Sequence, residues 1–477
     1  MIIEQLPQTK TLEFERAEKF GLERIAAYYR DCDYNICEYS LGIKLMCASL
    51  YRYRFAEVAG CLICRDEYEG IVYFDYPVVG PDGDLEAALS AIETYCMEKD
   101  IPLRYTTLPP SALGLLTARY DGVRLRKTYE CRDYCYRTEE IVEFAGKKYA
   151  GQRNHVRRFY RQYPNAVFRK MTARDIPALE VFANRFDATF QKRGEDAVNE
   201  REKAFAMLRM DRDDLFRIGC MELDGEIIGV ALGERCGNVL LEHVEKALSS
   251  EYEGLYPALF QAFVATFGSD CTYVNREDDA ADRGLRTSKM QYHPAHISQK
   301  YDMDVLNLLA FWDEIPTIET DRLRLTAIET ADAEAYRMLC TDDAHNRYWG
   351  YDYRTDLGDA SADGTYFVNV ARADFEEKRT LNFAIRADGE FVGETVLYRF
   401  DNRGGVELGV RILPAFLRRG YGKEAFEATA NWAIYTLGAE RVVAKCFREN
   451  AASVAMLSSV MRQIDADETM LYFEKRV

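Results

Sequence analysis

The chain has 477 residues, 48% of them hydrophobic, and a net charge of −17 at pH 7. This length favours about three domains of roughly 150 residues each, and the acidity argues against general nucleic-acid binding. The 13 cysteines lack the spacing of a disulfide framework or a zinc site, so we expect free thiols, no metal and a cytoplasmic protein. No apolar run approaches the ~18 residues that cross a bilayer, so we expect no transmembrane segment.

The first third, residues 1–140, mixes helical and strand-like patterns. Residues 57–64 and 70–74 predict a hairpin, and residues 85–99 have the apolar spacing of a helix. The many tyrosines of this region are interpreted as packing residues with one polar edge.

A basic segment opens the middle third. Between residues 145 and 174 the sequence has nine Lys or Arg and no Asp or Glu. A helix predicted over residues 152–163 places Arg153, Arg157 and Arg161 on one stripe, with Val156 and Phe159 facing the core. The stripe is either a solvated helix face or, over residues 147–163, a surface for a phosphate-rich partner such as the end of a tRNA, an anionic lipid headgroup or CoA.

Polar motifs follow in the order Val-Glu-Lys-Ala at 244–247, Asn-Arg-Glu-Asp-Asp at 275–279, Gly-Leu-Arg at 284–286, Ser-Lys at 288–289 and Pro294. With the basic helix, this order makes residues 20–305 resemble the catalytic half of the phosphatidylglycerol lysyltransferases, which is built as two tandem GNAT-like folds. The resemblance implies a second substrate site, with Glu277 or Asp279 recognising an amine. The residues assigned to it are Arg153, Arg157, Glu245, Asn275, Glu277, Asp279 and Lys289.

Two other groups of residues in this region are not expected to bind a metal. The acidic residues at 278, 279 and 282 do not have the alternating spacing of a calcium loop, so we expect a polar loop that closes a pocket and no metal. His243 and His293 have no partner at ligand spacing and are expected to be structural.

A strand, a glycine-bearing loop and a helix follow one another in the last third. Residues 405–412 alternate like a strand, Gly420 and Gly422 flank Tyr421, and apolar residues then recur at helical spacing from Ala425 onward. Converging backbone N–H groups at such a helix N-terminus suit a phosphate or pyrophosphate. A second strand at 441–446 precedes another helix, for which Asn450 is the expected N-cap.

This order, with Ile-Glu-Thr-Asp-Arg-Leu-Arg-Leu at 318–325, resembles the GCN5-related N-acetyltransferases (GNAT) over residues 312–477, in the branch that acetylates ribosomal-protein N-termini. The resemblance implies that acetyl-CoA is bound along an opening in the sheet and that Glu407 removes the amine proton. The tyrosine that many relatives use as general acid is replaced by Leu457, so Ser453 or water would protonate the thiolate. The residues assigned to CoA are Val410, Arg411, Ile412, Leu417, Arg418, Arg419, Gly420, Tyr421, Gly422, Asn450 and Ser453.

The sequence therefore predicts an α+β protein with mixed sheets, built as three GNAT-like folds in tandem at residues 1–140, 141–305 and 312–477. We expect the last fold to acetylate an amine on a small molecule or a protein N-terminus. Two alternatives stay open: an aminoacyl-tRNA-dependent transferase in the N-terminal module, or an N-terminal module that only binds. The aromatic stretch 347–353 is either a border of the acceptor site or a packed surface loop.

Overall fold

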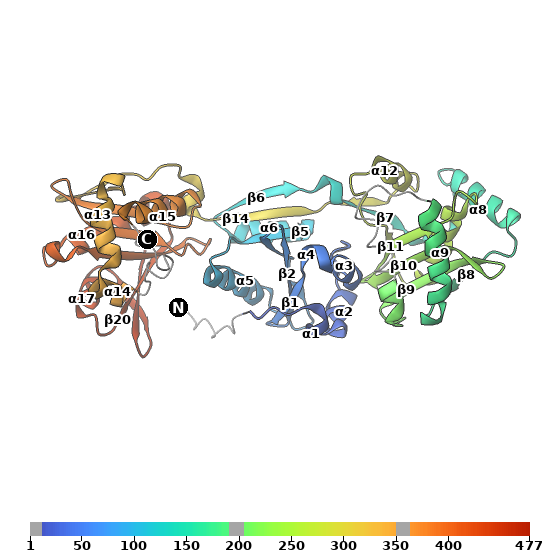
Figure 1. Cartoon of the computed structure of the whole chain (residues 1–477), viewed down its shortest axis with the longest axis horizontal. Coiled ribbons are helices and arrows are strands. Elements are labelled where there is room, and N and C mark those ends of the chain that lie inside the picture. The colour runs from blue at the N-terminus through green and yellow to red at the C-terminus, as the bar shows by residue number, and fades with distance from the viewer. Residues whose placement is uncertain (1–11, 190–204, 350–362) are drawn as a thin grey trace. The chain divides into compact units, whose positions relative to one another are not determined.

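The computed structural model describes residues 12–189, 205–349 and 363–477 (Figure 1). These residues form two compact units. The first contains the described residues up to Gly114 and Leu125–Asp304, and the second contains Leu115–Arg124 and Val305–Val477. Within the described ranges, no helix combines the length and the apolar character needed to cross a membrane.

The first of three mixed sheets has seven strands in the order β1-β2-β3-β5-β14-β6, with β4 paired to β2. β1, β2 and β3 are antiparallel neighbours, whereas β3 and β5 pair in parallel. The helix predicted at 85–99 is confirmed as α5 (Leu85–Lys99), which begins where the Asp84 side chain accepts a hydrogen bond from the N–H of Ala87. The strands are β1 (Arg54–Val58), β2 (Cys61–Tyr68), β3 (Ile71–Phe74), β4 (Val78–Val79), β5 (Arg104–Leu108), β6 (Gly122–Lys127) and β14 (Tyr301–Leu306).

The second sheet has the order β13-β7-β12-β11-β10-β9-β8, with β11 and β12 parallel. The helix α11 (Leu255–Phe267) packs apolar side chains against it, and the basic helix is confirmed as α8 (Ala150–Gln162), with Val156 and Phe159 buried. The strands are β7 (Asp133–Arg137), β8 (Val167–Lys170), β9 (Phe216–Leu223), β10 (Glu226–Cys236), β11 (Val239–Ala247), β12 (Tyr273–Asn275) and β13 (His296–Ser298).

The first two sheets are interleaved along the chain. Strand β7 precedes the predicted boundary at residue 140 but lies in the second sheet, and β14, near residue 305, returns to the first. The three predicted domain ranges stay a prediction. Tyr301–Leu306 form β14, in which Asp304 pairs with Arg104, and Leu308–Phe311 follow as a 3-10 turn.

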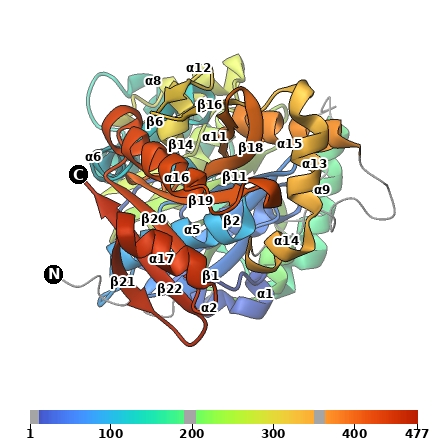
Figure 2. The same ribbon diagram turned by 90° about the vertical axis from the view of Figure 1, so that its left-hand side faces the viewer.

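The third sheet has eight strands in the order β15-β16-β17-β18-β19-β20-β22-β21. Figure 2 shows α16 (Tyr421–Trp432) along one face of this sheet, with α13 (Ala333–Thr341) and α15 (Gly364–Glu376) on the other. Residues 381–387 and 390–398 form an antiparallel hairpin around Asp388 and Gly389. The strands are β15 (Ile318–Glu319), β16 (Leu323–Ala327), β17 (Leu381–Ala387), β18 (Glu390–Tyr398), β19 (Gly405–Ile412), β20 (Arg441–Phe447), β21 (Arg462–Ala466) and β22 (Met470–Arg476).

Candidate functional site

The third sheet opens between β19 and β20. Parallel pairing joins residues 405–407 to residues 441–443 and ends at Glu407 and Val443, although β19 continues to Ile412 and β20 to Phe447. Beyond Glu407, the edge of β19 that faces β20 therefore has no strand partner among the described residues. Its backbone N–H and C=O groups can pair with the amides of an extended ligand.

The loop after β19 ends at the N-terminus of α16. Arg418 (φ 60°) and Gly420 (φ 81°) adopt left-handed conformations, and Gly420 is the N-cap without a side-chain hydrogen bond to the helix. The first N–H groups of an α-helix have no partner within the helix and lie at its positive end. A Cβ added to Gly422 would lie 3.2 Å from Ile412 Cγ1, so the helix start is held close to the strand end. We call residues 417–423 the cradle.

Arg322 supports the cradle from the neighbouring strand segment. Its Nε lies 2.7 Å from Glu424 Oε2 and its Nη1 donates to the carbonyl of Arg419 at 3.0 Å. Partial burial of Glu424 opposes ionisation, but hydrogen bonds from Thr320 and Arg322 lower its pKa. The sequence prediction missed this role of Arg322, although the residue belongs to the 318–325 segment that carried the resemblance.

Helices α5, α11 and α16 each lie in the chain between two strands that pair in parallel. Their N-termini differ. The N-terminus of α5 is capped by the carboxylate of Asp84. The N-terminus of α11 lies under α8, since a Cβ added to its N-cap Gly254 would lie 2.6 Å from the carbonyl oxygen of His155. Among these three, α16 begins with neither a side-chain cap nor a covering helix, and it is the candidate site for an anionic ligand.

Glu407 lies at the last position of β19 that pairs with β20, and it is buried. Its Oε1 accepts a hydrogen bond from Tyr398 Oη at 2.6 Å and lies 3.2 Å from Lys445 Nζ. Its Oε2 meets the Arg399 guanidinium at 3.6 Å. The carboxylate predicted as the general base therefore lies beside the opening, with Oε2 the less engaged oxygen.

The remaining residues assigned to CoA lie around the same opening. Asn450 is the N-cap of α17 (Ala451–Val460), as predicted, and its Oδ1 accepts a hydrogen bond from the N–H of Ser453 at 3.2 Å. Val410 and Ile412 follow Glu407 on β19, while Leu417, Arg419 and Tyr421 lie in the cradle. Arg411 turns its side chain away to Glu394, so it can offer a ligand only its backbone.

Two of the second-site residues lie near a comparable opening in the second sheet: Glu245 is on β11, and Lys289 Nζ donates to the carbonyl of Arg276 at 2.5 Å. Pairing of β11 with β12 ends at Leu241 and Asn275, and beyond it Arg276 binds Glu242 (Nε to Oε2, 2.7 Å) and Glu245. Burial and the nearby Glu242 raise the pKa of Glu245 to about 8, and burial and Arg276 lower the pKa of Lys289. The buried atoms without a hydrogen bond here are Glu242 Oε1, Glu245 Oε1 and Arg276 Nη1.

Three further second-site residues have partners within the chain. Asn275 donates to Asp133 at 2.9 Å, Glu277 contacts His243 at 2.6 Å, and Asp279 forms two 2.8 Å contacts with Arg286. The hydrogen bonds from Arg286 and Tyr134 lower the pKa of Asp279 to about 2. The structure therefore does not gather these three side chains with Glu245 around one space.

The basic helix presents two different arginines. Arg153 donates to the backbone carbonyls of Phe144 and Gly146, the latter at 2.7 Å, whereas Arg157 is exposed on the solvent side of α8. Arg157 is therefore better placed than Arg153 to meet a partner.

Lys300 occupies the centre of a buried cluster that sequence reasoning missed. Its Nζ lies 2.7 Å from Asp133 Oδ1, 2.6 Å from Glu38 Oε2 and 3.4 Å from Cys37 Sγ. Cys37, Glu38 and Asp133 also have the mutual spacing of metal ligands. The ammonium of Lys300 already supplies the positive charge that these groups need.

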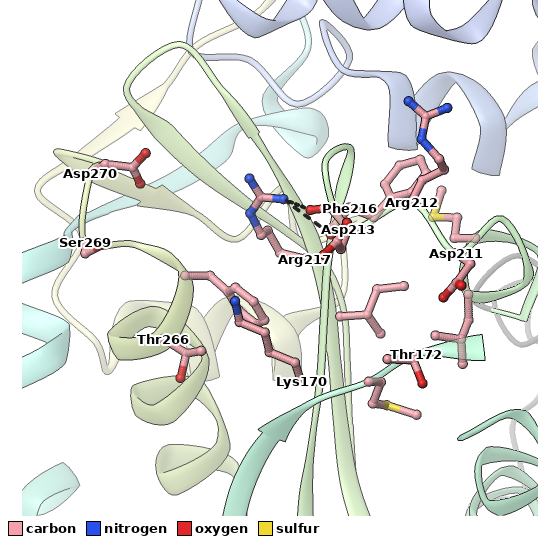
Figure 3. Close-up of a pocket in the computed structure, with 15 residues that line it drawn as sticks. Lys170, Thr172, Asp211, Arg212, Asp213, Phe216, Arg217, Thr266, Ser269 and Asp270 are labelled. Carbon is pink, nitrogen blue, oxygen red and sulfur yellow. Dashed lines mark hydrogen bonds between the residues drawn. The ribbon is translucent and has the colours of Figure 1, made fainter. Parts of the chain in front are cut away.

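A cavity of about 680 Å³ lies elsewhere in the first unit, between β8, the start of β9 and the end of α11 (Figure 3). Its charged groups have internal contacts: Arg217 donates to the Asp213 carbonyl, Asp270 pairs with Arg235, and Lys170 lies over the Phe267 ring. Lys170 belongs to the basic segment 145–174, but none of the site residues assigned from the sequence lines this cavity.

Of the aromatic stretch 347–353, residues 350–353 lie outside the described residues. Arg347, Tyr348 and Trp349 belong to α14 (Asp343–Trp349). Trp349 contacts Arg411 of β19, Tyr348 contacts Phe447 of β20, and Arg347 pairs with Glu449 just after β20.

Comparison with known proteins identifies two regions. Residues 30–303 match the family model described as phosphatidylglycerol lysyltransferase, C-terminal, and residues 322–460 match the acetyltransferase (GNAT) domain. The uncharacterized N-acetyltransferase YoaA of Bacillus subtilis is 28% identical over 145 residues, which are 30% of this chain and 80% of that protein. The uncharacterized protein MYCGA3080 of Mycoplasmoides gallisepticum is 25% identical over 182 residues, 36% of this chain and 56% of that protein's length.

Among solved structures, a conserved protein of unknown function from Bacteroides thetaiotaomicron has a TM-score of 0.57 and 23% identity, covering 61% of this chain and 99% of that one. At this identity the similarity shows the fold alone. It agrees with the tandem mixed sheets seen here.

Proposed function

Because the chain belongs to the family of the phosphatidylglycerol lysyltransferase C-terminal domain and carries a GNAT acetyltransferase domain, we propose that it is an acyltransferase whose C-terminal unit moves an acetyl group from acetyl-CoA to an amine. The GNAT match supports an enzyme that transfers acyl groups, and the donor and acceptor are our proposal. A cytoplasmic location belongs to the same proposal.

The observation that carries this proposal is the cradle at the open end of β19. An uncapped helix N-terminus follows, after a short loop, a strand edge that has no strand partner within the described ranges. The pyrophosphate of CoA suits the helix N-terminus, and its pantetheine amides suit the free edge beyond Glu407. Arg418, Arg419 and Lys423 add positive charge in the same segment.

The chemistry requires three steps from the protein. A backbone N–H near Val410 would stabilise the oxyanion that forms when the amine attacks the thioester carbonyl. Glu407 Oε2 would accept the amine proton directly or through water. Ser453, at the start of α17, or water would return a proton to the departing thiolate.

Titration calorimetry with acetyl-CoA tests the proposal. We expect micromolar binding that Gly420→Trp abolishes, because the indole would fill the cradle. Gly389→Trp is the matched control, since Gly389 (φ 83°) also has a left-handed conformation but lies in a hairpin turn with open space around it. Equal loss of binding in both variants, or no binding by the unaltered chain, would contradict the proposal.

A second candidate function is aminoacyl transfer from aminoacyl-tRNA in the middle of the chain. The buried, unpaired atoms of Glu242, Glu245 and Arg276 favour it, because such atoms mark a place for a polar ligand or water. The exposed part of α8, including Arg157 and Arg161, would then meet tRNA or an anionic lipid headgroup.

A filter-binding assay with charged tRNA, and sedimentation with phosphatidylglycerol vesicles, distinguish the partners of α8. We expect the double variant Arg157→Gln/Arg161→Gln to lose binding to one of them, while Arg158→Gln, whose side chain pairs with Glu253, changes little. Binding to neither partner would favour an N-terminal module that only presents the acceptor to the C-terminal unit.

A further inference from the structure

One face of the opening in the third sheet is suited to an amine acceptor. Side chains alternate along a strand, so Glu407, Gly409 and Arg411 point to the same face of β19. Lys445 of β20 contacts Glu407 and therefore shares this face. The opposite face is occupied by α16, where Thr429 bonds to Thr395 of β18 at 2.9 Å.

Helix α14 spans this face from one strand to the other. The Trp349 ring lies 4.4 Å from the Arg411 guanidinium, and a Cβ added to Gly409 would lie 2.6 Å from the ring. At the β20 side, Tyr348 meets the Phe447 ring at 5.8 Å and Arg347 pairs with Glu449 at 3.0 Å. An acceptor that reaches Glu407 on this face is therefore bounded by α14.

Among the described residues, the charged side chains in direct contact with Glu407 do not balance its charge. Arg411 is paired with Glu394 and Arg347 with Glu449, so both pairs are neutral. Glu407 has one negative charge but two cations beside it, Lys445 and Arg399. The side chains of Lys445 and Arg399 are 34% and 58% exposed, so both can reach a ligand.

We propose that the acceptor is a free α-amino acid, whose amine meets Glu407 Oε2 while Lys445 and Arg399 bind its carboxylate. This inference rests on the proposed acetyl transfer. Both cations lie within 3.6 Å of the Glu407 carboxylate. The acceptor's own amine and anion must therefore be only a few bonds apart, as they are in an α-amino acid. The N-terminal residue of a peptide has an amide in place of that carboxylate. It therefore does not neutralise the positive charge of Lys445 and Arg399.

The transfer step balances without another reactant. The ammonium of the amino acid first loses a proton to solvent. The neutral amine then forms a C–N bond to the acetyl carbonyl carbon, and the C–S bond breaks as CoA leaves as a thiolate. The second amine proton passes to Glu407 and, through Ser453 or water, to that sulfur, giving the N-acetyl amino acid and CoA thiol.

The test uses the full chain, acetyl-CoA and matched sets of acceptors: the common α-amino acids, their carboxamides and short peptides. CoA thiol release gives kcat/KM, and mass spectrometry identifies the product. We expect the best amino acid to exceed its carboxamide by at least about 10-fold, since one charge-assisted contact of about 1.4 kcal/mol corresponds to that ratio.

Lys445→Gln/Arg399→Gln should bring the ratio of acid to carboxamide close to one. Arg324→Gln, which removes an exposed charge paired with Glu319, should keep it. Tryptophan fluorescence checks folding, because all three tryptophans, Trp312, Trp349 and Trp432, lie in the second unit.

The inference is overturned if carboxamides or peptides are acetylated as fast as the acids, if no acceptor reacts although acetyl-CoA binds, or if the ratio survives in the double variant. A chain that does not bind acetyl-CoA at all would instead remove the proposed function on which the inference rests.

Discussion

Glu394 and Arg411 face each other at paired positions of β18 and β19, with Arg411 Nε 2.8 Å from Glu394 Oε1 and both side chains excluded from solvent. The pair lies under the Trp349 ring, at the open end of the sheet. A buried charge that loses its partner is strongly unfavourable, whereas an apolar pair of similar size is often tolerated.

We therefore expect Glu394→Ala to destabilise the second unit by about 3–5 kcal/mol, because the Arg411 charge would stay buried without this carboxylate. The double variant Glu394→Leu/Arg411→Met should be much closer to the unaltered protein. Urea unfolding followed by tryptophan fluorescence reports on this unit alone. A single variant no less stable than the double one would contradict the expectation.

Arg322 and Arg324 lie two residues apart but differ in their contacts. Arg322 binds Glu424 and the carbonyl of Arg419, and Arg324 meets Glu319 at 3.7 Å with both side chains exposed. We expect Arg322→Ala to weaken acetyl-CoA binding about 10-fold, since loss of one charge-assisted contact corresponds to roughly 1.4 kcal/mol. Calorimetry should show little change for Arg324→Ala, and similar affinities for both variants would remove the supporting role of Arg322.

The sequence predicted the elements of the C-terminal unit well because their patterns are local. The alternation at 405–412, the two glycines and the cap at Asn450 each act within a few residues, and the structure has the strand, the loop and the N-cap in those places. The same local signals predicted α5 and α8.

Contacts between distant residues were not predictable in this way. Arg276 reaches Glu242 across 34 positions and Lys300 reaches Glu38 across 262, and no local period marks such pairs. The motif at 275–279 is continuous in sequence, but its side chains have different partners: Asn275 bonds to Asp133, Glu277 to His243 and Asp279 to Arg286.

His243 makes the first unit sensitive to alkali. Burial alone would lower its pKa, but contacts to Glu234 at 2.9 Å and Glu277 at 2.6 Å raise the pKa of His243 to about 10, from 6.5. The folded state holds this proton more tightly than the unfolded state, so the stabilisation is complete below about pH 6.5 and is lost as pH rises towards 10. The loss is at most about 1.4 kcal/mol per pH unit.

Calorimetric unfolding between pH 6.5 and 10 measures this effect. All three tryptophans lie in the second unit, so the calorimetric transition that occurs without a change in tryptophan fluorescence belongs to the first unit. The midpoint temperature of this transition should fall with rising pH. His243→Gln should unfold at a lower temperature near neutral pH but show a flatter dependence, because no imidazolium remains to titrate. A slope as steep as that of the unaltered protein would assign the effect to other groups.

Gly409 sets how closely Trp349 approaches β19. A Cβ added to Gly409 would lie 2.6 Å from Trp349 Cη2 and 2.9 Å from its Cζ3, so Gly409→Ala must displace the indole from Arg411. We expect the KM for the acceptor to rise several-fold and the tryptophan emission to shift to longer wavelength. Binding of acetyl-CoA should change little, because the added methyl points to the face opposite α16.

A double-mutant cycle makes this expectation specific. If Gly409→Ala acts by moving the ring, then in a Trp349→Ala background the same substitution meets no indole and should add almost nothing to the KM. If the two effects instead add, Gly409→Ala acts through the backbone of β19, and Trp349 does not set the width of the acceptor site.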